Sequence, residues 1–274
     1  MGGRSRVSEK VWSKSILSFK ETNYDLYFNG CSFVQGSELQ DRFENVFCNL
    51  IANHFKVDWF RNSKVGGSND RIWRVTMEDI ISGHRPKLVI IGWSGPNRLE
   101  YLTAQRVWRQ AGFLSFRYDT RSLKVADDVE VFDHPDMTVP QYNGLKNYIK
   151  FVRSVEYNLI DTLNRMISLR HFLNSKGIPH LFYWMSKGQV NPVIKQLDKE
   201  RLEGANIIWS PQWRMKEKHY YKEIPELYDD GWYEWTKGKV PYGKGDHPLE
   251  EGHQLIADRI IEDIYDKNLD KFFN

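Results

Sequence analysis

The fold is decided by a short apolar run that ends in a glycine and a small nucleophile: Asp25-Leu26-Tyr27-Phe28-Asn29-Gly30-Cys31-Ser32-Phe33. Residues 24–29 predict a buried strand. Gly30 permits the tight turn that leaves Ser32 just past the carboxyl end of that strand. In open α/β sheets, ligands bind at this edge. Ser32 is therefore a candidate nucleophile, although a polar turn leading into a helix would have the same pattern.

Further apolar runs predict strands at 57–60, 88–91, 180–184 and 205–209. The unbroken run 88–91 is typical of a central parallel strand that is covered on both faces. Helical spacing of apolar residues predicts helices at 41–54, 70–82, 144–175 and 250–266. Five strands alternating with helices predict a doubly wound, three-layer α/β/α sandwich with a parallel five-stranded sheet. Right-handed crossovers would bring the loops that follow the strands to one edge.

Three segments lie outside this simple alternation. Residues 1–20 are predicted to form an N-terminal arm, and residues 21–274 a single domain. Residues 94–143 are rich in aromatic and charged side chains and fit no βα unit, so we expect an insertion beside the site, either a substrate wall or a structural flap. The aromatic-rich loop 211–245 either stacks on a flat substrate such as a sugar or uses its rings to pack itself.

The composition is that of a soluble globular protein, with 41% hydrophobic and 27% charged residues. A net charge of only +3 implies no strong field toward nucleic acid or membranes, so we expect neither as a partner. No apolar stretch reaches the ~18 residues of a membrane span, and the basic N-terminus lacks the apolar core of a secretory signal. We therefore expect a cytoplasmic protein. Cys31 and Cys48 have no metal or redox spacing and are expected to be free thiols.

A histidine precedes the last predicted helix, in Asp246-His247-Pro248. From there His247 can reach back to the edge that carries Ser32, whose hydroxyl needs a neighbouring base to become a nucleophile. Taken alone, the histidine is also an ordinary turn residue.

Two other histidines are alternatives to His247. The Asp-His-Pro motif occurs a second time inside the insertion, as Asp133-His134-Pro135, where we expect a plain loop. The spacing of His134, Asp246, His247 and His253 matches no known metal site, so neither a metal nor another cofactor is expected. We expect His253 to cap or pack the last helix.

Four short blocks resemble those of the SGNH (GDSL-like) hydrolases: Gly30-Cys31-Ser32-Phe33, Gly66-Gly67-Ser68-Asn69, Gly92-Trp93-Ser94, and Asp246-His247-Pro248 with Gly252-His253. They occur in the order of that family and span roughly residues 24–266. The wording of residues 66–72 is most similar to members encoded by bacteriophages. The resemblance implies a flavodoxin-like fold and ester or acyl hydrolysis without a metal, with Ser32 as the nucleophile and His247 as the base.

The same resemblance implies that the backbone N–H groups of Ser32 and Gly66 form part of an oxyanion hole, with Gly67 as the alternative glycine. Donors that are fixed before the reaction stabilise the developing negative charge. The third block of the family supplies an asparagine side chain to the hole, and this chain has Ser94 there, so Asn97 or Asn69 could replace it.

The acid of the family lies three residues before the histidine, where this chain has Lys244. The ring of His247 could therefore be oriented by Asp246, by a backbone carbonyl or by an acid from elsewhere. Asp246 is adjacent in sequence, and it reaches the ring of its neighbour only in a distorted loop.

Two functions of different classes fit these observations. The first is a serine hydrolase acting on a small-molecule or carbohydrate ester, such as an O-acetyl group. The second is a non-catalytic SGNH-like structural or binding component of a phage particle, with other phage structural proteins as partners. Intact Ser32, Gly66 and His247 favour the hydrolase, whereas Ser94 and Lys244 favour the second. A phage-encoded protein would lie in the host cytoplasm or in the virion.

Overall fold

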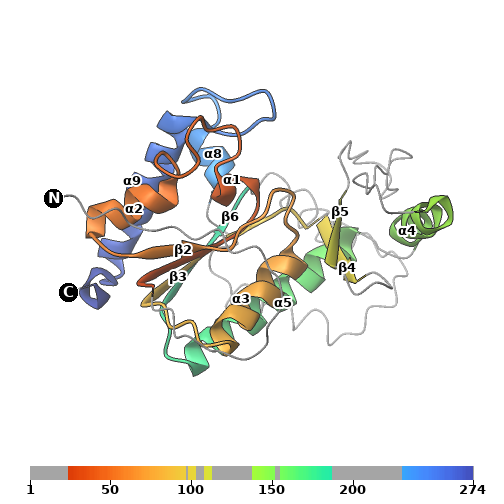
Figure 1. Cartoon of the computed structure of the whole chain (residues 1–274), viewed down its shortest axis with the longest axis horizontal. Helices are drawn as coiled ribbons and strands as arrows, with labels where there is room; N and C mark the ends of the chain where they lie inside the picture. The colour runs from red at the N-terminus through yellow and green to blue at the C-terminus, as the bar shows by residue number, and fades with distance from the viewer. Residues whose placement is uncertain are drawn as a thin grey trace, which may run out of the picture.

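The computed structural model describes residues 24–96, 98–102, 108–112, 138–151, 155–186 and 230–273. Within these ranges, four strands form one sheet in the order β2-β1-β3-β6 (Figure 1). They are β1 (Leu26–Asn29), β2 (Trp59–Arg61), β3 (Leu88–Trp93) and β6 (His180–Trp184). All three neighbouring pairs are parallel, with Leu26 opposite both Trp59 and Leu88. The predicted parallel α/β class is therefore confirmed.

Both faces of the sheet are buried, because alternate residues of each strand enter different cores. Leu88 and Ile90 pack in the core shared with α2 (Phe47–Phe55) and α9 (Glu250–Asp266). Val89 and Ile91 pack in the core shared with α3 (Asn69–Ile81) and α5 (Val155–Ser175). Figure 1 shows the two helix pairs on opposite sides of the sheet, which makes the three predicted layers.

The strand order places a topological switch point between β1 and β3. The chain passes from β1 through α2 to β2 on one side of the sheet, and then through α3 to β3 on the other. β3 lies between β1 and β6, as its apolar sequence predicts. The predicted fifth strand at 205–209 lies outside the described residues.

Two helix boundaries differ from the sequence prediction. The helix expected from residue 41 begins at Phe47, because the Asp41 carboxylate accepts the N–H groups of Phe43 at 2.8 Å and Glu44 at 2.9 Å and folds a separate turn. The helix expected at 144–175 is described as α4 (Val139–Phe151) and α5, with residues 152–154 outside the description. The helices expected at 70–82 and 250–266 are confirmed as α3 and α9.

The insertion after β3 contains an antiparallel pair, β4 (Arg98–Leu102) and β5 (Trp108–Gly112). This pair is fastened to α3 by Arg74, which donates two hydrogen bonds of 2.8 Å to the carboxylate of Glu100. The guanidinium of Arg74 also lies 4.2 Å from the ring centroid of Trp108. The shorter elements are α1 (Ser32–Gln35), α8 (Trp232–Thr236) and the 3₁₀ turn η3 (Asp270–Phe272).

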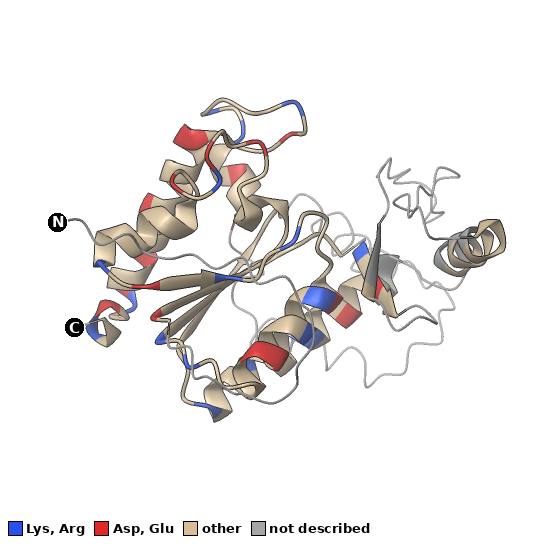
Figure 2. Ribbon diagram, in the orientation of Figure 1, with Lys and Arg blue, Asp and Glu red and all other residues tan. Residues whose placement is uncertain are grey.

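Charged residues of both signs are interspersed over the helices and loops, while the central strands carry few (Figure 2). This distribution is consistent with the small net charge. In the part of the chain that the structure describes, every helix is too short or too polar to cross a bilayer.

Candidate active site

Ser32 is the first residue of α1 and lies directly after the β1 turn, with 3% of its surface exposed. The turn is closed by Asn29, whose side-chain oxygen accepts the N–H of Gly30 at 2.8 Å. A Cβ atom on Gly30 would lie 2.9 Å from the carbonyl oxygen of Gly92, so only glycine lets the turns after β1 and β3 approach this closely. Ser32 therefore lies at the switch point, where doubly wound sheets bind their ligands.

The neighbouring thiol is buried in the core. Cys31 is fully buried, and its sulfur lies 3.3 Å from the sulfur of Met185. Cys48 is also buried, and burial raises the pKa of its thiol to about 12. Both cysteines are free, as expected.

The loop that follows β2 packs onto the Ser32 turn. The N–H of Lys64 donates to the carbonyl oxygen of Gly30 at 3.2 Å, and a Cβ on Gly67 would lie only 3.2 Å from that same oxygen. Gly66 has a φ of 70°, which favours glycine. The second glycine-containing block thus lies against the first.

These contacts distinguish between the two candidate glycines of the oxyanion hole. The N–H of Gly67 donates to the carbonyl oxygen of Lys64 at 2.9 Å. Among the described residues, the N–H groups of Ser32 and Gly66 have no acceptor. Gly66 is therefore the better candidate, together with Ser32.

The side chain of Asn69 forms three hydrogen bonds within the fold. Its amide nitrogen donates to the carbonyl oxygen of Ser94 at 2.9 Å and to the hydroxyl of Thr162 at 3.2 Å, and its oxygen accepts the N–H of Ser94 at 2.8 Å. The side-chain amide of Asn69 therefore donates one hydrogen bond to the turn after β3 and one to α5. The hydroxyl of Ser94 accepts a 2.8 Å bond from Arg98. Asn97 lies outside the described residues.

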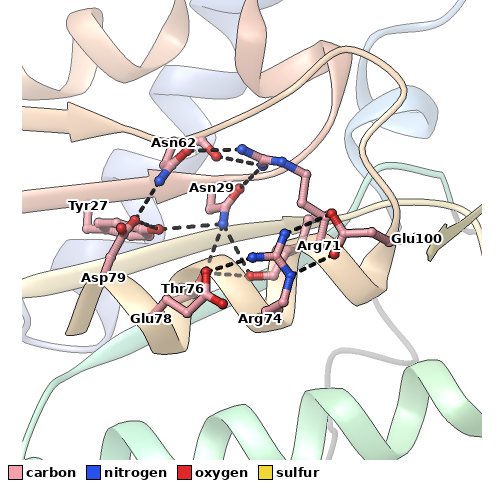
Figure 3. Close-up of polar contacts among 10 residues, drawn as sticks. Tyr27, Asn29, Asn62, Arg71, Arg74, Thr76, Glu78, Asp79 and Glu100 are labelled. Carbon is pink, nitrogen blue, oxygen red and sulfur yellow. Dashed lines mark hydrogen bonds and ion pairs between the residues drawn. The ribbon is translucent and has the colours of Figure 1, made fainter. Parts of the chain in front are cut away.

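A polar network joins the turn after β1 and the loop after β2 to α3 (Figure 3). The side-chain nitrogen of Asn29 donates to the hydroxyl of Thr76 at 2.9 Å and to the carbonyl oxygen of Ile72 at 3.2 Å. Arg71 donates to the carbonyl oxygen of Asn62 at 2.8 Å and to its side-chain oxygen at 3.0 Å. These bonds fix the end of β1 relative to the start of the glycine loop, which we define as residues 63–68.

The same network contains a buried carboxyl group. Asp79 accepts hydrogen bonds from the hydroxyl of Tyr27 at 2.8 Å and from the amide of Asn62 at 2.7 Å. Burial raises the pKa of Asp79 and raises that of Tyr27 well above its ordinary value. With both groups far from solvent, we assign this cluster a structural role.

His247 is carried back to the Ser32 turn by the loop between α8 and α9. The loop is closed by the N–H of Gly243, which donates to the carbonyl oxygen of His247 at 2.9 Å. The ring of His247 lies 5.6 Å from the ring of Phe33, the residue after Ser32. The turn and the histidine loop, which are far apart in the sequence, therefore contact each other.

Asp246 is directed away from the histidine ring. Its carboxylate forms an ion pair with Lys237 and accepts a 3.1 Å hydrogen bond from the hydroxyl of Tyr233. The ion pair with Lys237 lowers the pKa of Asp246. With a φ of 62°, Asp246 adopts the left-handed conformation, and its side chain anchors the loop. The contacts of Asp246 therefore do not include the ring of His247, which it was one of three candidates to orient.

The acid at the ring of His247 is Glu38. Its carboxylate lies 3.0 Å from Nδ1 of the histidine, although 209 residues separate the two in sequence. Sequence reasoning did not identify this residue, because Glu38 belongs to a polar turn without a motif. The sequence carried one indirect signal for an acid from elsewhere: Gly243 and Gly245, which flank Lys244, leave room for a side chain from another segment. In the structure, a Cβ on Gly243 would lie 2.5 Å from the carboxyl carbon of Glu38.

His253 is fully buried and packs α9, as expected. Its Nδ1 accepts the N–H of Phe47 at 3.3 Å, and the two rings stack at 5.7 Å. Burial lowers its pKa to about 3, so the ring is neutral. In the described ranges, no three His, Cys, Asp or Glu side chains gather as metal ligands would. Asp133-His134-Pro135 lies outside those ranges.

The described part of the aromatic-rich loop packs the fold. Trp232 is fully buried and fills the space above Gly92, where a Cβ would lie 2.3 Å from its ring. Lys237 lies 5.3 Å from the ring centroid of Tyr233 and 4.4 Å from that of Tyr242. Residues 211–229 lie outside the described ranges.

These features define a doubly wound α/β protein that has a serine turn and a histidine loop in contact at its switch point. The chain belongs to a family of unknown function, DUF6071, whose model matches residues 37–270. Comparison with curated protein sequences gives no match.

Several solved structures are similar in outline. A protein from Desulfitobacterium hafniense assigned to the G-D-S-L family of lipolytic proteins is 13% identical, with a TM-score of 0.43 and coverage of 85% of this chain and 96% of that one. An acetyl xylan esterase from the rumen bacterium Butyrivibrio proteoclasticus is 11% identical, with a TM-score of 0.45 and coverage of 93% and 66%. A Bacteroides fragilis protein assigned as an acylhydrolase is 15% identical, with a TM-score of 0.41 and coverage of 89% and 87%.

Proposed function

We propose that this protein is a serine hydrolase of the SGNH type that cleaves an ester, with Ser32 as the nucleophile and His247 as the general base. One observation carries the proposal: His247 packs on Phe33, next to Ser32, while its Nδ1 is bonded to a carboxylate. A ring that donates its Nδ1 hydrogen keeps the lone pair on Nε2. That nitrogen can accept the proton of a serine hydroxyl.

In the proposed reaction, the Ser32 oxygen attacks the carbonyl carbon of the ester while its proton passes to Nε2 of His247. The tetrahedral intermediate collapses and expels the alcohol, which takes the proton from the histidine. Water activated by the same nitrogen then attacks the acyl-enzyme, releases the carboxylic acid and restores the serine. Water is the only co-reactant.

The N–H groups of Ser32 and Gly66 are the proposed donors to the oxyanion of that intermediate. They come from two loops that pack together, and neither has an acceptor among the described residues. Donors fixed in this way need no rearrangement as the charge develops, and losing one typically costs ~10²–10³ in rate. The hydroxyl of Ser94, which keeps its own hydrogen, is a third candidate.

The substrate class is proposed from the sequence resemblance alone. We propose an acyl ester, and an O-acetyl group on a carbohydrate is the first class to test. The alternative is a non-catalytic component of a phage particle, which Ser94 and Lys244 favoured. Glu38 weakens this alternative, because the histidine has an acid partner even though Lys244 replaces the acid of the family.

The test is hydrolysis of p-nitrophenyl acetate and of an O-acetylated carbohydrate by the purified chain. Ser32→Ala and His247→Ala should each remove nearly all turnover, and the double variant should lose little more, because the two residues act as one unit. Ser175→Ala, at the exposed end of α5, is the matched control and should retain full activity. Equal turnover with and without Ser32 would contradict the proposal and leave the non-catalytic alternative.

A further inference from the structure

We propose that Glu38 is the positioning acid of a Ser32–His247–Glu38 triad, supplied by the nucleophile's own turn instead of by the histidine loop. The inference rests on the proposed function and adds a residue to it. Its first support is the 3.0 Å separation between the Glu38 carboxylate and Nδ1 of His247. A carboxylate at Nδ1 selects the tautomer with its lone pair on Nε2 and stabilises the imidazolium that forms during reaction.

The carboxylate is held by more than the ring. The N–H of Gly245 donates to it at 2.8 Å and the N–H of His247 at 3.3 Å. These donors, with that of Gly245 first among them, lower the pKa of Glu38, so it is ionised at neutral pH. Two backbone donors and one ring nitrogen therefore fix a charged acceptor in a single orientation.

Glycines make the space that this side chain occupies. A Cβ on Gly243 would lie 2.5 Å from the carboxyl carbon of Glu38, and a Cβ on Gly245 would lie 3.0 Å from one of its oxygens. Real Cβ contacts are longer than the first of these distances. The histidine loop is thus shaped to receive an acid from another part of the chain.

Backbone strain lies on both sides of the contact. Glu38 has a φ of 70° and Asp246, directly before the histidine, has a φ of 62°. Residues other than glycine seldom adopt this left-handed conformation, and it persists where surrounding structure enforces it, often at functional sites. One strained residue supplies the acid, and the other turns the chain so that the next side chain meets it.

The acid and the nucleophile are fixed relative to one another by a short segment. The N–H of Ser37 donates to the carbonyl oxygen of Ser32 at 3.0 Å, and Gly36 ends α1 in the left-handed conformation. Glu38 therefore follows the nucleophile by six residues in a closed turn. Any movement of that turn would carry Ser32 and Glu38 together.

The charged and titratable groups around His247 include Glu38 from the turn after α1, Asp246 and Lys237 from the histidine loop, and His253 from α9. Asp246 and Lys237 form an ion pair with each other, and burial keeps His253 neutral. Glu38 is the carboxylate that contacts the ring of His247 directly.

The experiment compares the purified chain with Glu38→Gln and with Glu44→Gln, which removes the same charge from an exposed position six residues further on. Glu38→Gln should lower kcat by ~10²-fold or more, within the ~10⁴-fold loss that accompanies conversion of a triad carboxylate to an amide. Glu38→Asp should recover part of the rate, and Glu44→Gln should match the wild type.

A readout without turnover is the far-downfield proton resonance of a histidine Nδ1–H bonded to a carboxylate. The wild type and Ser32→Ala should both give this resonance, and Glu38→Gln should lose it. If Ser32→Ala abolishes turnover while Glu38→Gln keeps the wild-type rate and resonance, the role of Glu38 is overturned and the proposed function stands. If turnover does not need Ser32, the proposed function fails, and with it the triad.

Discussion

Arg71 and Asn62 are joined by two hydrogen bonds, of 2.8 Å to the carbonyl oxygen and 3.0 Å to the side-chain oxygen of the asparagine. Asn62 directly precedes the glycine loop 63–68. Arg71 lies in the first turn of α3, the helix that follows this loop. The arginine therefore closes the loop on itself. Through its longer contact of 3.5 Å with Asn29, it also connects the loop to the turn that carries Ser32.

This relationship predicts that Arg71 stabilises the whole site. Arg71→Met should lower the free energy of unfolding by ~2–4 kcal/mol, because two partly buried oxygens of Asn62 lose their charged donor. Urea denaturation measures the change. Arg259→Met is the control, since that guanidinium is exposed and pairs with Glu262 at 3.3 Å on the surface, and it should cost at most ~0.5 kcal/mol. Equal losses in the two variants would contradict the assignment.

The buried neutral ring of His253 should make the free energy of unfolding fall as the pH is lowered. Its pKa is lowered by burial to about 3 in the folded protein, against an unfolded value near ~6.5. The stabilising contribution of the neutral ring is thus complete above ~6.5 and is lost as the pH falls from there toward the folded value. Between pH 7 and pH 5 the loss from this group should be ~2 kcal/mol.

The measurement is urea unfolding at both pH values for the wild type and for His253→Gln. Glutamine cannot take up a proton in this range but can still accept the N–H of Phe47, so the variant should lose ~2 kcal/mol less on acidification. The same loss in both proteins would mean that the ring is not buried and neutral.

Gly243 offers a way to disturb Glu38 without changing its charge. Gly243→Ala places a Cβ where the carboxyl carbon of Glu38 lies, so the acid must move and kcat should fall by ~10-fold or more. Gly144→Ala is the matched control, because no atom lies within 4 Å of the added Cβ. Steady-state kinetics with p-nitrophenyl acetate measure both. A full rate in Gly243→Ala would show that the position of Glu38 does not matter.

The strands were predicted well from the sequence because each buried strand has an apolar pattern within its own few residues. The run Leu88–Ile91 is apolar at every position, and in the structure alternate residues enter the two cores on either side of the sheet. The periodicity of 250–266 likewise predicted α9 with its bounds. The start of α2 was missed because the Asp41 side chain binds backbone N–H groups that a helix would otherwise use.

The candidate site was predictable only in part, for a physical reason. Ser32, Gly66 and His247 lie in short motifs whose residues are close in sequence. The pairing of Glu38 with His247 spans 209 residues and is created by the way two loops pack, so neither loop indicates it alone. Asp246 was the nearest acid in sequence, yet its backbone conformation directs it to Lys237.

The central claim, that Ser32 is an activated nucleophile, is tested most directly by covalent labelling. The purified chain is incubated with a fluorophosphonate probe, and its intact mass and tryptic peptides are then measured, with fragmentation that separates Ser32 from Cys31. We predict one probe per chain on Ser32, no labelling of Ser32→Ala, and greatly slowed labelling of His247→Ala. Absence of labelling in the folded wild-type chain, or equal labelling of Ser32→Ala, would contradict the account.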